Sequence, residues 1–358
     1  MEFVNHSLAT SLNKLEDCEA SVACSTMPEV PKNFEYSYYC SRSKSLSILT
    51  PLLEQKNIAN LIRTKSLNLL HGSMLHDGGF EAMKASSKFG IPFVAHAHGA
   101  DIQNVPQIGY GALQNPLEKA KLNDVLRGAH KLIAPSSLAK EYLVELGAQP
   151  ESVALWYSGT PVDVVDKIPF TDMRAKLNIS ADDFVLISVG RNSKVKRMEL
   201  LFESLKLLKK STLKFKCICV GPQKDLENLA QKYDIQDIVR TTGTVSNVSD
   251  IFNLYRSSNL YISTSWLELF SLTASDALAC GIPIVITKKQ GIKDLVISGK
   301  NGWIIDKDEP DGISSLILSI AKEANKIATN APNISSTVKH LTWDAAAVEM
   351  LKTYKSIV

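Results

Sequence analysis

Short apolar runs alternate along the chain with longer segments in which apolar residues recur at helical spacing. The short runs predict strands, and the longer segments predict amphipathic helices. The predicted strands cover residues 66–70, 93–97, 131–134, 153–157, 184–189, 215–220, 238–240, 260–263, 284–287 and 303–305. The predicted helices cover residues 80–88, 138–146, 197–209, 225–232 and 248–256. This alternation is typical of repeated β-α-β units around a parallel sheet, so the sequence predicts an α/β fold.

The length of the chain, 358 residues, exceeds what one hydrophobic core usually holds. Two series of alternating elements, similar in length, therefore predict two Rossmann-like domains. The segment SGTPVDVVDKIPF, residues 158–170, contains a glycine and two prolines that break regular structure, and it is the predicted joint. The predicted domains are residues 1–165 and 166–342. Residues 343–358 carry apolar side chains at helical spacing and predict a docked amphipathic helix.

The first residues fit a Rossmann-like domain poorly. Residues 5–15 predict a helix and residues 20–24 a strand, whereas such a domain begins with a strand before its first helix. Almost no sequence is present ahead of that helix. We therefore expect the first strand to be missing, either because the true start lies upstream or because the chain is degenerate.

Charge and composition exclude several classes of protein. The 40 basic residues nearly balance the 37 acidic ones, so the net charge of +3 does not by itself indicate a nucleic-acid partner. The start, MEFVNHSLATSL, has an early acidic residue and no apolar centre, unlike a secretory signal, and no run is long enough to span a bilayer. The six cysteines form no CxxC pair, which argues against a zinc site or a disulfide framework. We expect a cytoplasmic protein.

The stretch VGRNSKVKR, residues 189–197, is the first candidate for chemistry. Gly190 follows a predicted strand and lets a ligand approach the backbone. Arg191 and Lys196 then place two cations before a predicted helix, an arrangement suited to a diphosphate. A solvated basic loop is the alternative. No GxGxxG follows a predicted strand and no GxxxxGK[ST] occurs, so neither a dinucleotide fingerprint nor a P-loop is present.

The stretch SWLELFSLTASDALACGIPIVIT, residues 265–287, is the second candidate. Thr273 and Asp276 have capping-box spacing, which predicts a helix starting near Thr273 with Asp276 in its first turn. Helix stabilisation alone could explain Asp276. Glu268 precedes this helix and is predicted to point into the cleft above the sheet, where parallel sheets bind ligands. The alternative is an ordinary glutamate on a surface loop.

The stretch FVAHAHGAD, residues 93–101, is the third candidate. Strand periodicity places His96 and His98 on one side, with His98 at the strand end, where it could meet a substrate hydroxyl. A histidine satisfied within the core is equally consistent with this pattern. Upstream, HDGGFEAM, residues 76–83, offers a glycine-rich turn that is more simply an ordinary one. The DxD spacing at residues 306–308 lies in an acidic turn, so no magnesium site is predicted.

Taken together, these stretches resemble glycosyltransferase family 4. SVGRNSKVKRMELLFESL resembles the family's G-R-x-x-x-x-K-G segment, and ELFSLTASDALACGIPIVIT resembles its E-x-F-G-x-x-x-x-E-A-x-A-x-G-x-P-V segment. QGIKDLVISGKNGWII resembles the glycine-rich tail that follows, and IPFVAHAHGADI resembles the H-G-x-D segment of bacterial polysaccharide transferases. The resemblance covers roughly residues 65–358. It implies the GT-B fold, with two Rossmann-like domains facing across a cleft and a C-terminal helix that crosses back to the N-terminal domain.

The resemblance also implies roles for individual residues. Arg191 and Lys196 would neutralise the donor diphosphate and stabilise the leaving nucleoside diphosphate. Glu268 would bind a hydroxyl of the donor sugar, Asp276 the ribose hydroxyls, and His98 the donor sugar from the other domain. The remaining donor-binding positions that match the family's motifs are Gly190, Phe270, Ser271 and Leu272.

The activity implied by the resemblance is that of a retaining hexosyltransferase that needs no metal and no cofactor. Its co-substrate would be a nucleotide diphosphate sugar, and its acceptor a glycan or lipid-linked sugar in surface polysaccharide biosynthesis. Peripheral contact with the inner face of the membrane would then involve the basic stretches at residues 119–131 and 206–216, whose alternative is a solvated surface.

Five positions depart from the family's pattern. Asp276 stands for a glutamate, Asp294 for another glutamate, and Ser271, Arg197 and Gln290 for glycines. These departures keep a second hypothesis open, that of a non-catalytic nucleotide-sugar-binding subunit or degenerate transferase. A third is a sugar-nucleotide epimerase, which shares the two-domain architecture. The basic loop together with Glu268 favours the transferase.

Overall fold

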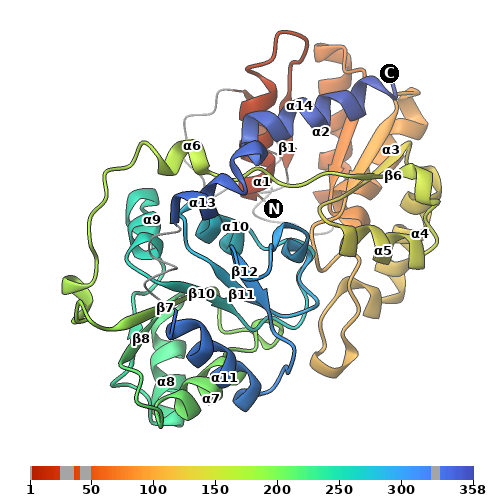
Figure 1. Cartoon of the computed structure of the whole chain (residues 1–358). Coiled ribbons are helices and arrows are strands. Elements are labelled where there is room, and N and C mark those ends of the chain that lie inside the picture. Colours follow the sequence, from red (N-terminus) through yellow and green to blue (C-terminus); the bar gives the residue numbers. More distant parts are fainter. Residues whose placement is uncertain (1, 25–35, 41–49, 324–330) are drawn as a thin grey trace. The chain divides into compact units, whose positions relative to one another are not determined.

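A computed structural model describes residues 2–24, 36–40, 50–323 and 331–358. The chain divides into two compact units, residues 1–159 with 343–358, and residues 160–342 (Figure 1). Each unit is built around a parallel sheet. The sequence-based division assigned residues 160–165 to the first domain, whereas helix α6, Val162–Val165, packs in the core of the second unit.

The first unit contains a four-stranded parallel sheet in the order β3-β4-β5-β6. Its strands are β3, Leu70–Ser73; β4, Phe93–His96; β5, Lys131–Ala134; and β6, Val153–Leu155. Strands β1, Ser21–Cys24, and β2, Ser37–Cys40, pair in parallel as a separate sheet. The helices are α1, Glu2–Leu12; α2, Thr50–Lys65; α3, Phe80–Phe89; α4, Pro116–Gly128; α5, Ser137–Glu145; and α14, Trp343–Lys355.

Local sequence explains several element boundaries in this unit. Ser136 caps α5 by accepting a hydrogen bond from the backbone N–H of Ala139, and Asn115 caps α4 just before a proline at its first position. The predicted strand at residues 66–70 is misplaced: Ser66 takes a left-handed conformation at the end of α2, and β3 begins only at Leu70. A π-helical turn, Met74–Gly79, joins β3 to α3 where a glycine-rich turn was predicted.

The C-terminal helix α14 belongs to the first unit, where it contacts α1. The Trp156 indole N–H donates to the carbonyl of Ala346 at 2.7 Å, and the Ser11 hydroxyl donates to Asp344 at 2.7 Å. Gly159 makes the close approach to α14 possible, because a Cβ there would lie 2.5 Å from the Trp343 Cα. The described part of the chain begins with α1, so the expectation about a preceding strand stays a prediction.

The second unit contains a six-stranded parallel sheet in the order β12-β11-β10-β7-β8-β9. The strands are β7, Phe184–Val189; β8, Phe215–Val220; β9, Val239–Thr241; β10, Leu260–Ser263; β11, Ile284–Ile286; and β12, Gly302–Ile304. Its other helices are α7, Met198–Leu208; α8, Gln223–Tyr233; α9, Val248–Arg256; α10, Leu272–Ala279; α11, Pro310–Ala321; and α13, Ala331–Ser336. The strands predicted at residues 184–189, 215–220 and 260–263 are confirmed to the residue.

Helices cover both faces of this sheet, which is why its central strands are almost continuously apolar. Residues 184, 186, 217 and 219 face a core formed with α7, α8 and α11, and residues 185, 187, 218 and 220 face a core formed with α6, α9, α10 and α13. Figure 1 shows α7, α8 and α11 together on one side of the sheet. The strand order reverses between β7 and β10, and this switch point positions the candidate site.

Candidate active site

The candidate site of the second unit lies at the carboxyl ends of β7 and β10. These strands are neighbours in the sheet, but their outgoing connections run to opposite sides because the strand order reverses there. Such a switch point leaves a crevice between the two loops, and open α/β sheets bind ligands in it. The loop after β7 carries Gly190, Arg191 and Lys196, and the loop after β10 carries Glu268.

Two cations of the first loop differ in their surroundings. The Arg191 side chain is exposed and makes no hydrogen bond or ion pair with any described residue. The Lys196 side chain is only 26% exposed, and its stem lies beside Gly190, where an added Cβ would contact it at 3.6 Å. The backbone of Gly190 packs directly against Gly221, because a Cβ on Gly221 would clash with the Gly190 carbonyl oxygen. Of these two charges, that of Arg191 is unpaired among the described residues and that of Lys196 is anchored.

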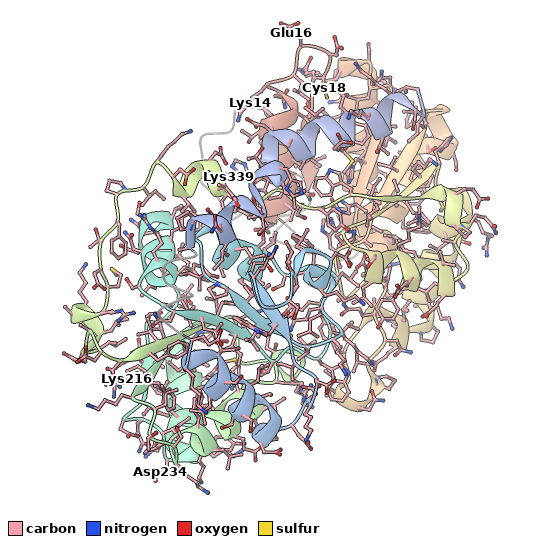
Figure 2. All side chains as sticks on the ribbon, in the orientation of Figure 1. Lys14, Glu16, Cys18, Lys216, Asp234 and Lys339 are labelled. Carbon is pink, nitrogen blue, oxygen red and sulfur yellow. The ribbon has the colours of Figure 1, made fainter. Side chains whose placement is uncertain are left out.

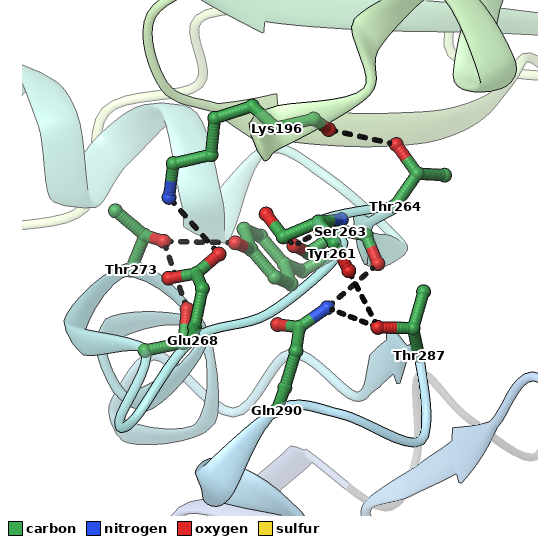
Figure 3. A network of polar contacts seen from close by, with 10 residues as sticks. Lys196, Tyr261, Ser263, Thr264, Glu268, Thr273, Thr287 and Gln290 are labelled. Atoms are coloured by element: carbon green, nitrogen blue, oxygen red, sulfur yellow. Dashed lines mark hydrogen bonds and ion pairs between the residues drawn. The ribbon is translucent and has the colours of Figure 1, made fainter. Parts of the chain in front are cut away.

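Lys196 and Glu268 form an ion pair, with Lys196 Nζ 2.9 Å from Glu268 Oε1 (Figure 3). Glu268 is the more buried partner, at 13% side-chain exposure. Screening by water is reduced at this depth, so the pair is stronger than one on the surface. The structure thus brings together two residues that the sequence assigned to the same donor molecule.

The backbone of Glu268 is fixed by the segment after β11. The Glu268 N–H donates to the carbonyl of Lys289 at 3.0 Å, and its carbonyl accepts from the N–H of Gly291 at 2.8 Å. Between them, the buried Gln290 amide donates to the Ser263 carbonyl at 3.1 Å and to the Thr287 hydroxyl at 3.2 Å (Figure 3). Gln290, which stands where the family has glycine, therefore ties the loop of Glu268 to the ends of two strands.

The two loops are also joined to each other. The Thr264 hydroxyl lies within hydrogen-bond distance of the carbonyls of Lys196, at 3.2 Å, and Arg197, at 3.0 Å. Arg197 adopts the left-handed conformation, with φ 51°, that glycine takes without strain. Its guanidinium lies over the Trp266 ring at 5.2 Å and pairs with Asp308 at 2.6 Å. The Arg197 side chain, which stands where the family has glycine, is therefore held by Trp266 and Asp308.

Helix α10 begins beside this network. Its N-cap is Ser271, whose side chain makes no capping bond, and Leu272 is its first residue. The predicted capping box at Thr273 is therefore wrong, and Asp276 lies beyond the first turn. The Thr273 hydroxyl instead contacts the Tyr261 hydroxyl at 2.8 Å and the Ser271 hydroxyl at 3.3 Å (Figure 3). The Ser271 side chain is thus turned into the protein, and Phe270 packs against the adjacent apolar core.

Asp276 is a carboxyl that lacks a counter-charge among the described residues. Its side chain makes no hydrogen bond or ion pair within that part of the chain, and burial raises its pKa to about 7. Burial and then the Asp276 carboxylate also raise the pKa of Tyr255. Removal of a carboxyl from water disfavours its charged form unless a donor or cation compensates. A ligand hydroxyl is one group that could do so.

His98 lies in the first unit, in the loop that follows β4. Buried Asp101 holds this loop by accepting the N–H of His98 at 3.1 Å, of Gly99 at 2.7 Å and of Leu75 at 3.1 Å. Burial lowers the pKa of His98 to about 3, so the ring is neutral at physiological pH. The other candidate residues belong to the second unit, and contact of His98 with the donor stays a prediction.

The acidic turn and one or two basic residues of each basic stretch form local ion pairs. Asp306 pairs with Lys288 at 2.7 Å, and no group of three or more His, Cys, Asp or Glu suited to a metal occurs in the described ranges. In the stretch at residues 206–216, Lys209 pairs with Asp237 at 2.7 Å, near Lys216 and Asp234 (Figure 2). None of the helices described is long and apolar enough to cross a bilayer.

Several residues of the site were not identified from the sequence. Tyr261, Thr273, Thr287 and the side-chain role of Gln290 carry no motif of their own. These residues are all polar and lie in a strand, a helix or tight loops that are mostly buried. This pattern points to a site only once the structure shows their hydrogen-bond partners. Ser263 and Ser265 belong to the same class, with hydroxyls 3.1 Å apart at the end of β10.

Comparison with known proteins agrees with this geometry. Residues 169–334 match the family described as glycosyl transferases group 1, and residues 1–164 match the family described as Glycosyltransferase Family 4. The D-inositol 3-phosphate glycosyltransferase 1 of Catenulispora acidiphila is 24% identical over 81% of this chain and 72% of its own length.

Among solved structures, sucrose-phosphate synthase from Thermosynechococcus elongatus has a TM-score of 0.82 at 20% identity, covering 98% of this chain and 91% of its own. The Anabaena protein Alr3699/HepE, solved in complex with UDP and glucose, has a TM-score of 0.77 at 21% identity, covering 99% of this chain and 95% of its own. These likenesses give the fold, and the two family matches together span nearly the whole chain. The chain is a member of glycosyltransferase family 4, an enzyme of the GT-B fold that uses a nucleotide-sugar donor.

Proposed function

We propose that this enzyme is a retaining, metal-independent hexosyltransferase that moves a sugar from a nucleoside diphosphate sugar to a glycan or lipid-linked acceptor. We further propose that it acts in surface polysaccharide biosynthesis at the inner face of the membrane. Retention and the polysaccharide context rest on the resemblance of the sequence to bacterial members of family 4. The donor class rests on the residues of the second unit.

The observation that carries the proposal is the pairing of Lys196 with Glu268, in a loop that also carries Arg191, a cation that no described residue pairs. A donor diphosphate brings negative charge that two cations can neutralise, and a further charge develops as the nucleoside diphosphate leaves. Cations already in place stabilise that charge without reorganisation, which is the role a divalent metal takes in other transferases. Glu268 is then a carboxylate acceptor for a hydroxyl of the sugar whose phosphate Lys196 binds.

The first test is calorimetric binding of UDP-, GDP- and ADP-sugars in the presence of EDTA. Binding of one nucleotide class is expected, and Arg191→Ala is expected to weaken it. Loss of a hydrogen bond to a charged group costs about 1.5–3 kcal/mol, or roughly 10- to 100-fold in Kd. Because Arg191 is exposed and has no partner in the described ranges, its removal leaves the fold intact.

Arg127→Ala is the matched control, since Arg127 is 72% exposed and pairs with Asp124 on α4. Binding that is equal in both variants would contradict the assignment of the basic loop to the diphosphate. Absence of binding to any donor would instead support a non-catalytic or degenerate chain. Isomerisation of the bound donor without any acceptor would identify an epimerase.

A further inference from the structure

Three histidines of the first unit share one face of its sheet. His71 on β3 is in register with Val94 on β4, and His96 and His98 follow Val94 at steps of two residues. Side chains two apart on a strand face the same side, and so do side chains paired across neighbouring strands. The same face is covered by α14, whose residue Tyr354 is buried.

Hydrogen bonds link these side chains into a chain. The Tyr354 hydroxyl bonds His71 Nδ1, and His71 Nε2 lies 3.3 Å from His96 Nδ1. The His96 ring then lies beside the His98 ring, with centroids 4.2 Å apart and planes inclined by 34°. Within the described residues, His96 Nε2 and His98 Nε2 are buried and have no hydrogen-bond partner.

The direction of this chain follows from the neutral state of the rings. Burial lowers the pKa of His71 to about 4 and that of His96 well below its ordinary value, so each ring carries one N–H. No other acceptor for the Tyr354 hydroxyl proton is found in the described part of the chain, so the hydroxyl donates to His71 Nδ1. His71 must then donate from Nε2 to His96 Nδ1, which leaves the proton of His96 on Nε2.

We propose that Tyr354, His71 and His96 form a directed hydrogen-bond relay that presents the Nε2–H of His96, beside the ring of His98, to an oxygen of a bound ligand. An unpaired buried N–H costs about 1–3 kcal/mol, which an incoming acceptor recovers. His96 is therefore a binding residue, and Tyr354 and His71 are positioning residues that fix its tautomer.

The chemistry of the two nitrogens defines the ligand class. His96 offers one neutral N–H donor, and His98 Nε2 donates or accepts according to the tautomer of its ring. A hydroxyl both donates and accepts, so it suits either arrangement. They offer no positive charge to a phosphate. The subsite therefore fits a sugar hydroxyl, and its assignment to a sugar of this reaction rests on the proposed function.

The relay is tested by NMR of the intact protein labelled with ¹⁵N-histidine, without ligand. Both His71 and His96 are expected as Nε2–H tautomers. Tyr354→Phe removes the donor to His71 and is expected to redistribute both tautomers, whereas Tyr233→Phe, a half-buried tyrosine of the second unit, leaves them unchanged. An Nδ1–H tautomer of His71 in the wild type would overturn the relay.

The subsite is tested by titrating the same samples with methyl α-D-glucoside at millimolar concentrations. The His96 Nε2 resonance is expected to move in the wild type, and Tyr354→Phe is expected to weaken the binding roughly tenfold, as loss of one oriented hydrogen bond would. A His96 resonance that does not move, or moves equally in both proteins, would overturn the subsite. Donor calorimetry reports on the basic loop separately, so failure of the proposed function is distinguishable from failure of this inference.

Discussion

Replacing Glu268 by glutamine is expected to lower kcat for sugar transfer at least roughly 100-fold while the donor still binds. Glutamine keeps the shape of the side chain but loses the charge that accepts a donor hydroxyl, a loss of about 3 kcal/mol if the bond forms only in the transition state. The Kd of the nucleotide is expected to change little or to fall, because Lys196, now unpaired, is free to meet the diphosphate. Calorimetry and single-turnover transfer separate the two effects.

Glu199→Gln is the matched control, since Glu199 pairs with Lys232 at 2.8 Å on the surface of the same unit, with both side chains about 60% exposed. This variant is expected to keep wild-type kcat and Kd. Wild-type turnover in Glu268→Gln would remove Glu268 from the chemistry and, with it, the main support for the transferase mechanism. Equal loss of binding and turnover would make Glu268 a ground-state contact.

Prediction from sequence succeeded best where burial is uniform. Strands such as β7 and β8 are covered by helices on both faces, so their apolar runs mark them directly. It failed at β3, where His71 and Gly72 interrupt the pattern. His71 is tolerated in the core because Tyr354 bonds it from 283 residues away, and no local window contains that partner.

The same contrast applies to the candidate site: residues within motifs were predicted, and contacts between distant segments were not. Glu268, Lys196 and Arg191 were assigned because their motifs match the family, and the sequence placed them after strands. Their direct contact was not predicted, because 72 residues separate Lys196 from Glu268 and only the order of strands in the sheet makes their loops neighbours. The support from Gln290 was missed for a related reason: its position matched a glycine of the family, so it counted only as a departure.

Besides Gln290, two of the departures have a physical account in the structure. Arg197 takes the left-handed backbone of the glycine it replaces, at a cost of about 1 kcal/mol, and contacts with Trp266 and Asp308 offset that cost. Ser271 directs its hydroxyl to Thr273, and α10 still begins directly after it. Neither change removes a cation or Glu268 from the site, which favours an active enzyme over a degenerate one.

Replacing Asp276 by asparagine is expected to stabilise the protein at pH 8 and to have little effect near pH 4. In the unfolded chain the Asp276 carboxyl ionises near its ordinary pKa of 3.8, whereas in the folded protein burial raises the pKa to about 7. The folded state therefore binds more protons between these values, and the free energy of unfolding falls as pH rises through them. Between these pKa values, each pH unit lowers the free energy of unfolding by about 1.4 kcal/mol. Ionisation of Asp276 therefore removes a few kcal/mol of stability from the wild type, and the asparagine variant does not lose it. Near pH 4 the difference is small, because the amide and the protonated carboxyl both leave hydrogen-bonding groups unmatched.

Chemical denaturation of both proteins at several pH values measures this difference. The stability of Asp276→Asn minus that of the wild type is expected to grow from pH 4 to pH 7 and then to level, whereas Asp182→Asn, at an exposed loop position, shows no such growth. A constant difference would mean that Asp276 is solvated or paired in solution. A carboxyl that lacks a partner and lowers stability is typical of a binding site, because a bound ligand can supply the missing partner. If ribose hydroxyls donate to Asp276, a bound donor should recover at pH 8 much of the stability that the free enzyme loses, and should recover less in the asparagine variant.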